Sequence, residues 1–205
     1  MSGTLNSIEN WGRGGSPEDY SAPLVDENGQ PYDQFVKTTR EYLKPLEPTV
    51  DLTIRGQKVQ LRAWEVNHFG SNPLILLEPV AQEHLELTAR LYNGDRLAQE
   101  LILGVGGVRM LRALEMDVRL YHFNEGHALF AGFELLREEM AKGLSFSDAR
   151  AVVKERVVFT THTPVVAGNE THGIEDMLDA GAGLDGTFDA SHLEQLGENP
   201  FQMTV

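Results

Sequence analysis

The chain has 205 residues, and 41% of them are hydrophobic, which is enough to bury a sizeable core in one domain or a large piece of one. Its net charge of -14, with no dense cluster of Lys or Arg, argues against nucleic acid and membrane surfaces as partners and favours a neutral ligand such as a sugar. The absence of cysteine excludes disulfides and thiolate chemistry, and the lack of a signal peptide or membrane-length apolar run leads us to expect a cytoplasmic protein.

Irregular sequence occupies residues 1–48, which are rich in Gly, Ser, Asn, Pro and acids and predict an N-terminal arm. Apolar and polar residues then alternate over 50–54 and 58–66, on either side of a turn that begins at Arg55, and this pattern predicts a β-hairpin. The continuous apolar run at 73–78 is typical of a strand that is covered on both faces.

A long helix is predicted over residues 96–115, with Asp95 as its N-cap and leucines and valines at helical spacing. Gly104, Gly106 and Gly107 lie inside it, and each costs about 1 kcal/mol relative to Ala. A phosphate-binding loop needs a strand directly before its glycines, whereas here the helical pattern continues into them. The glycines therefore favour close packing of a neighbouring backbone over phosphate binding.

The next four predicted elements form one crossover unit: a strand at 117–123, helices at 128–142 and 145–155, and a strand at 156–160. This order predicts two parallel strands. The carboxyl ends of parallel strands meet at one edge of a sheet, where α/β enzymes present functional groups.

Polar residues follow both of these strands. Asn124 is a candidate N-cap, and Glu125 and His127 offer an acceptor and a donor that would suit sugar hydroxyls or would merely satisfy the helix terminus. His162 is flanked by threonines at the end of the second strand and is well placed to meet a ligand. His122 lies inside an apolar run, so we expect a core histidine there.

The sequence gives little support for a zinc site, a serine nucleophile or a glycosidase carboxylate pair. Glu125, His127 and His162 could together ligate zinc, but their spacing matches no helical HExxH arrangement, and a metal site is not expected. No serine lies in a nucleophile-elbow context, and no carboxylate pair of glycosidase type can be recognised.

Five ordered blocks of the sequence resemble α-1,4-glucan phosphorylases, most of all the shorter bacterial and archaeal form. The blocks are Arg90 to Arg96, Gln99 to Arg109, Phe123 to His127, Gly143 to Phe146, and Val158 to Gly168. The resemblance implies an α/β fold in which residues 49–205 form part of the Rossmann-like N-terminal domain of a two-domain GT-B glycosyltransferase fold. The chain would then be a fragment of that domain.

The resemblance also implies an activity, namely the phosphorolysis of terminal α-1,4-linked glucose from glycogen or maltodextrin to glucose 1-phosphate, with pyridoxal phosphate as cofactor. Carried over by motif position, His162 would be a catalytic residue beside the glucosyl unit. Asn124, Glu125, His127 and Thr163 would bind substrate. The implied partners are an α-glucan and inorganic phosphate, and the resemblance leaves homo-oligomerisation open.

Departures from the family pattern concern the chemical centre. The family's cofactor lysine and its early glycine-rich loop have no counterpart, and Glu115 stands where glycine is usual. We therefore expect the chain alone to be inactive and to bind no pyridoxal phosphate. An alternative is a non-catalytic glucan-binding or regulatory module derived from the fold, and a weaker one is a glycosyltransferase that uses a nucleotide sugar.

Overall fold

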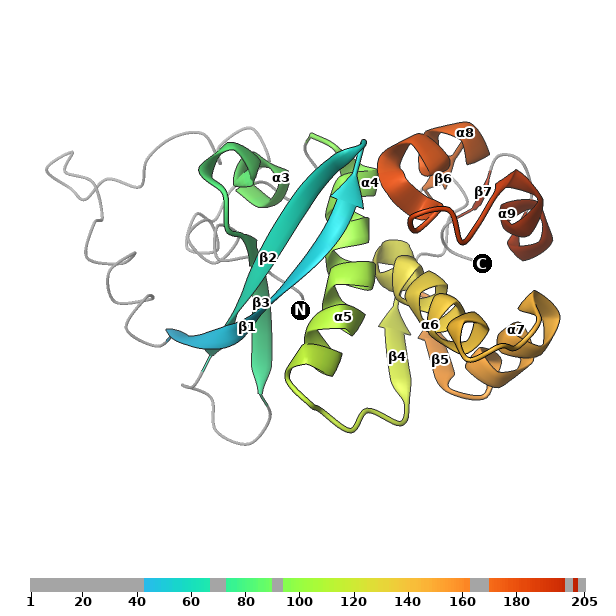
Figure 1. Cartoon of the computed structure of the whole chain (residues 1–205), viewed down its shortest axis with the longest axis horizontal. Helices are drawn as coiled ribbons and strands as arrows, with labels where there is room; N and C mark the ends of the chain where they lie inside the picture. The colour runs from blue at the N-terminus through green and yellow to red at the C-terminus, as the bar shows by residue number, and fades with distance from the viewer. Residues whose placement is uncertain (1–42, 67–72, 90–93, 163–169, 198–200, 203–205) are drawn as a thin grey trace, which may run out of the picture.

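The computed structural model describes residues 43–66, 73–89, 94–162, 170–197 and 201–202, which form a mixed α/β structure (Figure 1). In chain order the elements are β1 (Leu43–Ile54), β2 (Gln57–Val66), β3 (Leu74–Pro79), η2 (Gln82–His84), α3 (Glu86–Ala89), α4 (Arg96–Leu101), η3 (Ile102–Gly106), α5 (Gly107–Ala113), β4 (Tyr121–Asn124), η4 (Gly126–Ala128), α6 (Leu129–Ala141), α7 (Phe146–Lys154), β5 (Val157–Thr160), β6 (Thr171–His172), α8 (Ile174–Met177), η6 (Leu178–Ala182), α9 (Ala190–Leu196) and β7 (Phe201–Gln202).

The predicted hairpin is confirmed. Strands β1 and β2 pair antiparallel around Arg55 and Gly56, whose φ angles of 46° and 73° suit a tight hairpin turn, and β3 adds to β2 as a third strand. Residues 43–48 of the predicted arm belong to β1 instead, and residues 1–42 lie outside the described part of the chain. A register shift between Leu46 and Thr49 accommodates the prolines that interrupt the alternation, and a strand at the edge of the sheet tolerates them.

The predicted long helix is present as α4, η3 and α5 in succession, with the Asp95 side chain accepting the N–H of Ala98. Its middle turn is a π-helix that contains the first two glycines. A Cβ added at Gly104 would lie 2.7 Å from the carbonyl carbon of Phe130, at the start of α6, and one added at Gly106 would lie 2.5 Å from a methyl group of Leu61. The predicted approach of a neighbouring backbone is therefore confirmed at Gly104, whereas at Gly106 the close neighbour is a side chain.

The crossover unit is confirmed as β4, α6, α7 and β5, with β4 and β5 parallel and side by side (Figure 1). Gly143 follows the C-cap of α6 and has a φ of 97°, a conformation that stops the helix. The Ser145 hydroxyl caps α7 by accepting the N–H of Asp148. Strand β4 is shorter than predicted and spans only Tyr121–Asn124.

The hydrophobic core joins this unit to the C-terminal helices. Phe130 and Phe133 on α6 are buried and pack edge to face, with ring centroids 5.2 Å apart. Phe133 also contacts Phe188 and Phe201, which lie before α9 and in β7. Residues 174–182, which are rich in Gly and Asp, form the helices α8 and η6, and Met177, Ala180 and Ala182 are buried in this core.

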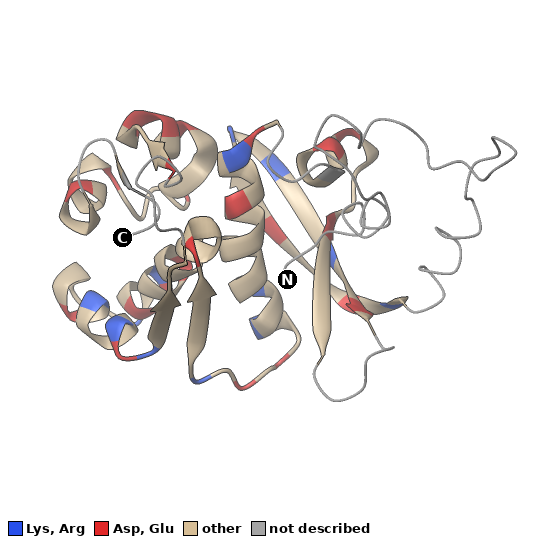
Figure 2. Cartoon of the chain, turned by 180° about the vertical axis from the view of Figure 1, so that it is seen from behind, with Lys and Arg blue, Asp and Glu red and all other residues tan. Residues whose placement is uncertain are grey.

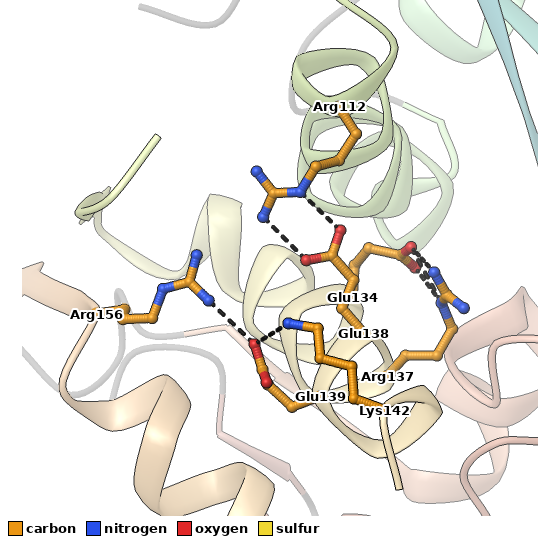
Figure 3. Close-up of polar contacts among 7 residues, drawn as sticks. All are labelled: Arg112, Glu134, Arg137, Glu138, Glu139, Lys142 and Arg156. Atoms are coloured by element: carbon orange, nitrogen blue, oxygen red, sulfur yellow. Dashed lines mark hydrogen bonds and ion pairs between the residues drawn. The ribbon is translucent and has the colours of Figure 1, made fainter. Parts of the chain in front are cut away.

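Ion pairs reinforce the packing of α6 against its neighbours (Figure 3). Arg112 on α5 donates two hydrogen bonds of 2.9 Å to Glu138, and one carboxylate oxygen of Glu139 accepts from Lys142 at 2.7 Å and Arg156 at 3.1 Å.

Basic and acidic positions are interspersed along the described chain (Figure 2). None of the described helices is both long enough and apolar enough to cross a membrane.

Candidate functional site

The parallel strands β4 and β5 end at the same edge of their sheet, as the sequence predicts. Asn124 pairs in register with Thr160, and the N–H of Glu125 donates to the carbonyl oxygen of Thr160 at 2.9 Å. The residues that follow the two strands, Glu125 and His162, are thereby brought into contact although they lie 37 positions apart.

Glu125 is the buried centre of this edge, with only 4% of its surface exposed. Its Oε1 accepts the backbone N–H of His162 at 2.5 Å and lies 3.1 Å from Nδ1 of the same residue. Its Oε2 accepts the hydroxyl of Thr161 at 3.4 Å. The carboxylate therefore ties the end of β4 to the loop that follows β5.

The His162 ring projects to the surface, with 66% of its side chain exposed. Its Nε2 lies 3.1 Å from Oδ1 of Asn124, whose side chain is also at the surface. Asn124, Glu125 and His162 thus form one strand-end site that joins a buried carboxylate to an exposed imidazole. This arrangement can offer ring and amide hydrogen bonds to a polar ligand.

Two expectations about single residues are wrong. Asn124 is the last residue of β4 and caps no helix, and the short helix η4 begins at Gly126 without a side-chain cap. His122 is exposed rather than buried, because strand alternation turns it away from its buried neighbours, and its Nε2 lies 2.7 Å from the Thr160 hydroxyl. Thr163, the remaining predicted site residue, lies outside the described residues.

His127 belongs to a second polar cluster, which we call the Arg96 cluster and which consists of Arg96, Glu100, His127 and Glu170. The Arg96 Nη2 atom donates to Glu100 at 2.6 Å and to Glu170 at 2.9 Å, and it lies 3.2 Å from Nδ1 of His127. Arg96 and Glu100 are not among the site residues predicted from the sequence. These two residues are spaced i, i+4 on a helix whose inner face is otherwise apolar. That spacing is the sequence signal that could have pointed to an ion pair.

Burial raises the pKa of Glu100 to about 7, although hydrogen bonding to His127 and the charge of Arg96 oppose the change. The neighbouring carboxylate of Glu170 raises it further. Burial also acts to raise the pKa of Glu170, but hydrogen bonds with Arg96 and Glu100 outweigh that effect and lower it. Oε2 of Glu100 is buried and has no hydrogen-bond partner among the described residues, an environment that favours the uncharged carboxyl group and agrees with its raised pKa.

Metal ligands of suitable type do gather in the Arg96 cluster, since one atom each from Glu100, His127 and Glu170 lie within 4.8 Å of one another. The Arg96 guanidinium, however, already contacts both carboxylates and supplies the positive charge that a cation would bring. The alternative zinc set would require His127 beside Glu125 and His162, whereas the contacts of the described residues place His127 with Arg96.

Comparison with known proteins places the chain near one group of enzymes. It is 34% identical over 174 residues to a maltodextrin phosphorylase of Thermococcus litoralis, covering 77% of this chain and 21% of that protein. It is 40% identical over 144 residues to a glycogen phosphorylase of Mycobacterium tuberculosis, covering 63% of this chain and 17% of that protein. An uncharacterized protein of Methanocaldococcus jannaschii is 32% identical over 195 residues, or 91% of this chain and 35% of that protein.

No protein-family profile matches the chain. The chain spans about a third or less of the length of these relatives. Similarity to several phosphorylases at 30–40% identity supports a relation at the level of the family: the chain is related to the glycogen and maltodextrin phosphorylases.

Proposed function

We propose that the chain is the glucan-facing part of an α-1,4-glucan phosphorylase, an enzyme that cleaves terminal glucose units with inorganic phosphate. The observation that carries the proposal is the strand-end site, in which two parallel strands bring Asn124, Glu125 and His162 together. Similarity to maltodextrin and glycogen phosphorylases supports the same conclusion. The GT-B architecture belongs to this proposal, with the described residues as part of its first Rossmann-like domain.

In this proposal the exposed His162 ring and Asn124 amide bind hydroxyl groups of the terminal glucosyl unit, and His127 and Thr163 contact the neighbouring sugar. Each of these groups forms neutral hydrogen bonds of the kind that carbohydrates accept and donate. A neutral ligand also avoids the repulsion that an anionic polymer would meet on a chain with a net charge of -14.

The described lysines do not fit a pyridoxal phosphate site, which requires a lysine for the Schiff base. Lys44, Lys58 and Lys142 form exposed ion pairs, and Lys154 is exposed on α7. Lys37 lies outside the described residues. We accordingly assign the cofactor to no residue of this chain, and we expect the purified chain to give no stoichiometric Schiff-base absorbance when pyridoxal phosphate is added.

Phosphorolysis tests the proposal. Maltoheptaose, phosphate and pyridoxal phosphate would be incubated with this chain, and separately with the polypeptide encoded up to the natural stop codon. We expect glucose 1-phosphate from the longer polypeptide only, with strong loss in His162→Ala and little change in His122→Ala, which alters an exposed histidine of the same sheet. No product from either polypeptide, together with retained maltoheptaose binding, would instead favour a non-catalytic glucan-binding module.

A further inference from the structure

Glu125 has an unusual backbone conformation, with φ 62° and ψ -176°. A residue with a side chain adopts this region at a cost of roughly 1–3 kcal/mol, so the surrounding contacts must hold it there. The carboxylate makes those contacts, since it is buried and directed at the loop after β5. Strain at a strand end, offset by contacts to one loop, points to a positioning function for this residue.

The contacts of Glu125 define where the proton of the His162 ring lies. Oε1 accepts the backbone N–H of His162, so this oxygen acts as an acceptor. The same oxygen is 3.1 Å from Nδ1, a distance at which a proton on that ring nitrogen can be donated to the carboxylate. Glu125 thus fixes both the backbone of His162 and one edge of its ring, from a position that solvent does not reach.

The opposite edge of the ring is held differently. Nε2 lies 3.1 Å from Oδ1 of Asn124, an acceptor that a neutral ring with its proton on Nδ1 does not satisfy, and both side chains are exposed. Water competes with hydrogen bonds at the surface, so this contact is weak and exchangeable, whereas the buried contact to Glu125 is costly to break.

We propose that Glu125 is the positioning residue that fixes the His162 imidazole through Nδ1 and the backbone N–H, and that Asn124 is an exchangeable partner of Nε2 which a ligand hydroxyl group replaces. The identity of that ligand as a glucan rests on the proposed function. The division between a fixed edge and an exchangeable edge of the ring follows from the geometry of the chain itself.

Nitrogen-15 NMR of the 205-residue chain tests the fixed edge without any ligand. We expect the shift of a protonated Nδ1 for His162, together with a strongly downfield backbone amide proton. In Glu125→Gln both signals should move, while Glu175→Gln, an exposed change on α8, should leave them in place. Unchanged His162 signals in Glu125→Gln would overturn the proposal. If that variant does not fold, an unprotonated Nδ1 in the wild-type chain would overturn it as well.

Titration with maltoheptaose tests the exchangeable edge. The Nε2 signal of His162 and the side-chain amide of Asn124 should shift, while Nδ1 should stay fixed. An Nε2 signal that stays unchanged on saturation with maltoheptaose would refute the exchange. If the wild-type chain binds no maltoheptaose, the sugar function and the exchange both fail, while the ligand-free spectra still decide the role of Glu125.

Discussion

At the scale of single residues, burial and charge shift the pKa values of the two carboxyl groups of the Arg96 cluster in opposite directions. Glu100 is 1% exposed and has a raised pKa, whereas the pKa of its neighbour Glu170 is lowered by hydrogen bonds with Arg96 and Glu100. Near neutral pH Glu100 is therefore partly protonated, whereas Glu170 is ionised. His127 is in contact with the same guanidinium, so the protonation of Glu100 sets the charge beside a residue of the proposed sugar site.

Folding stability should fall as the pH rises from 4.5 to about 7, because folded Glu100 keeps a proton that the unfolded chain releases. The full loss is roughly 3–4 kcal/mol, since the pKa rises from 4.5 to about 7 and one pKa unit corresponds to about 1.4 kcal/mol. Glu170 acts in a separate window, because its lowered pKa removes stabilisation only as the pH falls below 4.5. Urea unfolding at a series of pH values measures both effects.

The variant Glu100→Gln mimics the protonated carboxyl group and should flatten the decline between these pH values. Glu175→Gln, an exposed change on α8, serves as the control and should keep the wild-type decline. The same decline in Glu100→Gln as in the wild type would show that another group is responsible.

At the scale of elements, the contact between the long helix and the start of α6 depends on Gly104. A methyl group there would meet the backbone of Phe130 and Ala131, which cannot move aside as a flexible side chain can. We expect Gly104→Ala to destabilise the fold by about 2 kcal/mol or more. Gly107→Ala is the matched control, because nothing lies within 4 Å of the added Cβ and helix propensity favours the change by about 0.5–1 kcal/mol.

Thermal or urea unfolding of the two alanine variants measures the difference. Equal effects of the two substitutions would contradict a role for Gly104 in helix packing, since both positions lie in the same continuous helix.

Sequence patterns predicted a structural feature correctly where all the residues that specify it lie close together in the chain. The turn at Arg55 and Gly56, the Asp95 cap and the end of α6 at Gly143 were all predicted from residues within a few positions of each feature. The convergence of Glu125 with His162 followed from the parallel order of two strands, which is a rule of topology rather than of composition.

Long-range contacts could not be predicted in the same way. Arg96 contacts Glu170 across 74 positions, and no periodicity links the two. His122 was expected in the core because its neighbours are apolar, but alternation along β4 buries those neighbours on one face and exposes His122 on the other. Which faces are covered depends on tertiary packing, and that information is absent from a local window.

At the scale of the whole molecule, the two-stranded parallel sheet exposes apolar side chains. Val158 and Phe159 on β5 are 47% and 37% exposed, and Leu120, directly before β4, is 59% exposed, although parallel sheets are usually covered on both faces. We expect the isolated chain to associate with increasing concentration, because exposed apolar surface promotes contact between molecules. Sedimentation velocity should show less association for the double variant Val158→Thr/Phe159→Ser than for the wild-type chain.

Val80→Thr is the control for this surface. Val80 is 40% exposed, but it follows β3, which belongs to the three-stranded sheet. A monomer at all concentrations, or an equal effect of the control, would contradict the prediction that the parallel sheet causes association.

The central claim is that the two strand ends form an α-glucan site, and backbone amide shifts on addition of maltoheptaose test it most directly. The account predicts that the largest shifts occur at residues 124–127 and 160–162, and that cellohexaose, with β-1,4 linkages, produces much smaller ones. Shifts spread over other parts of the chain, or equal shifts with both sugars, would contradict it.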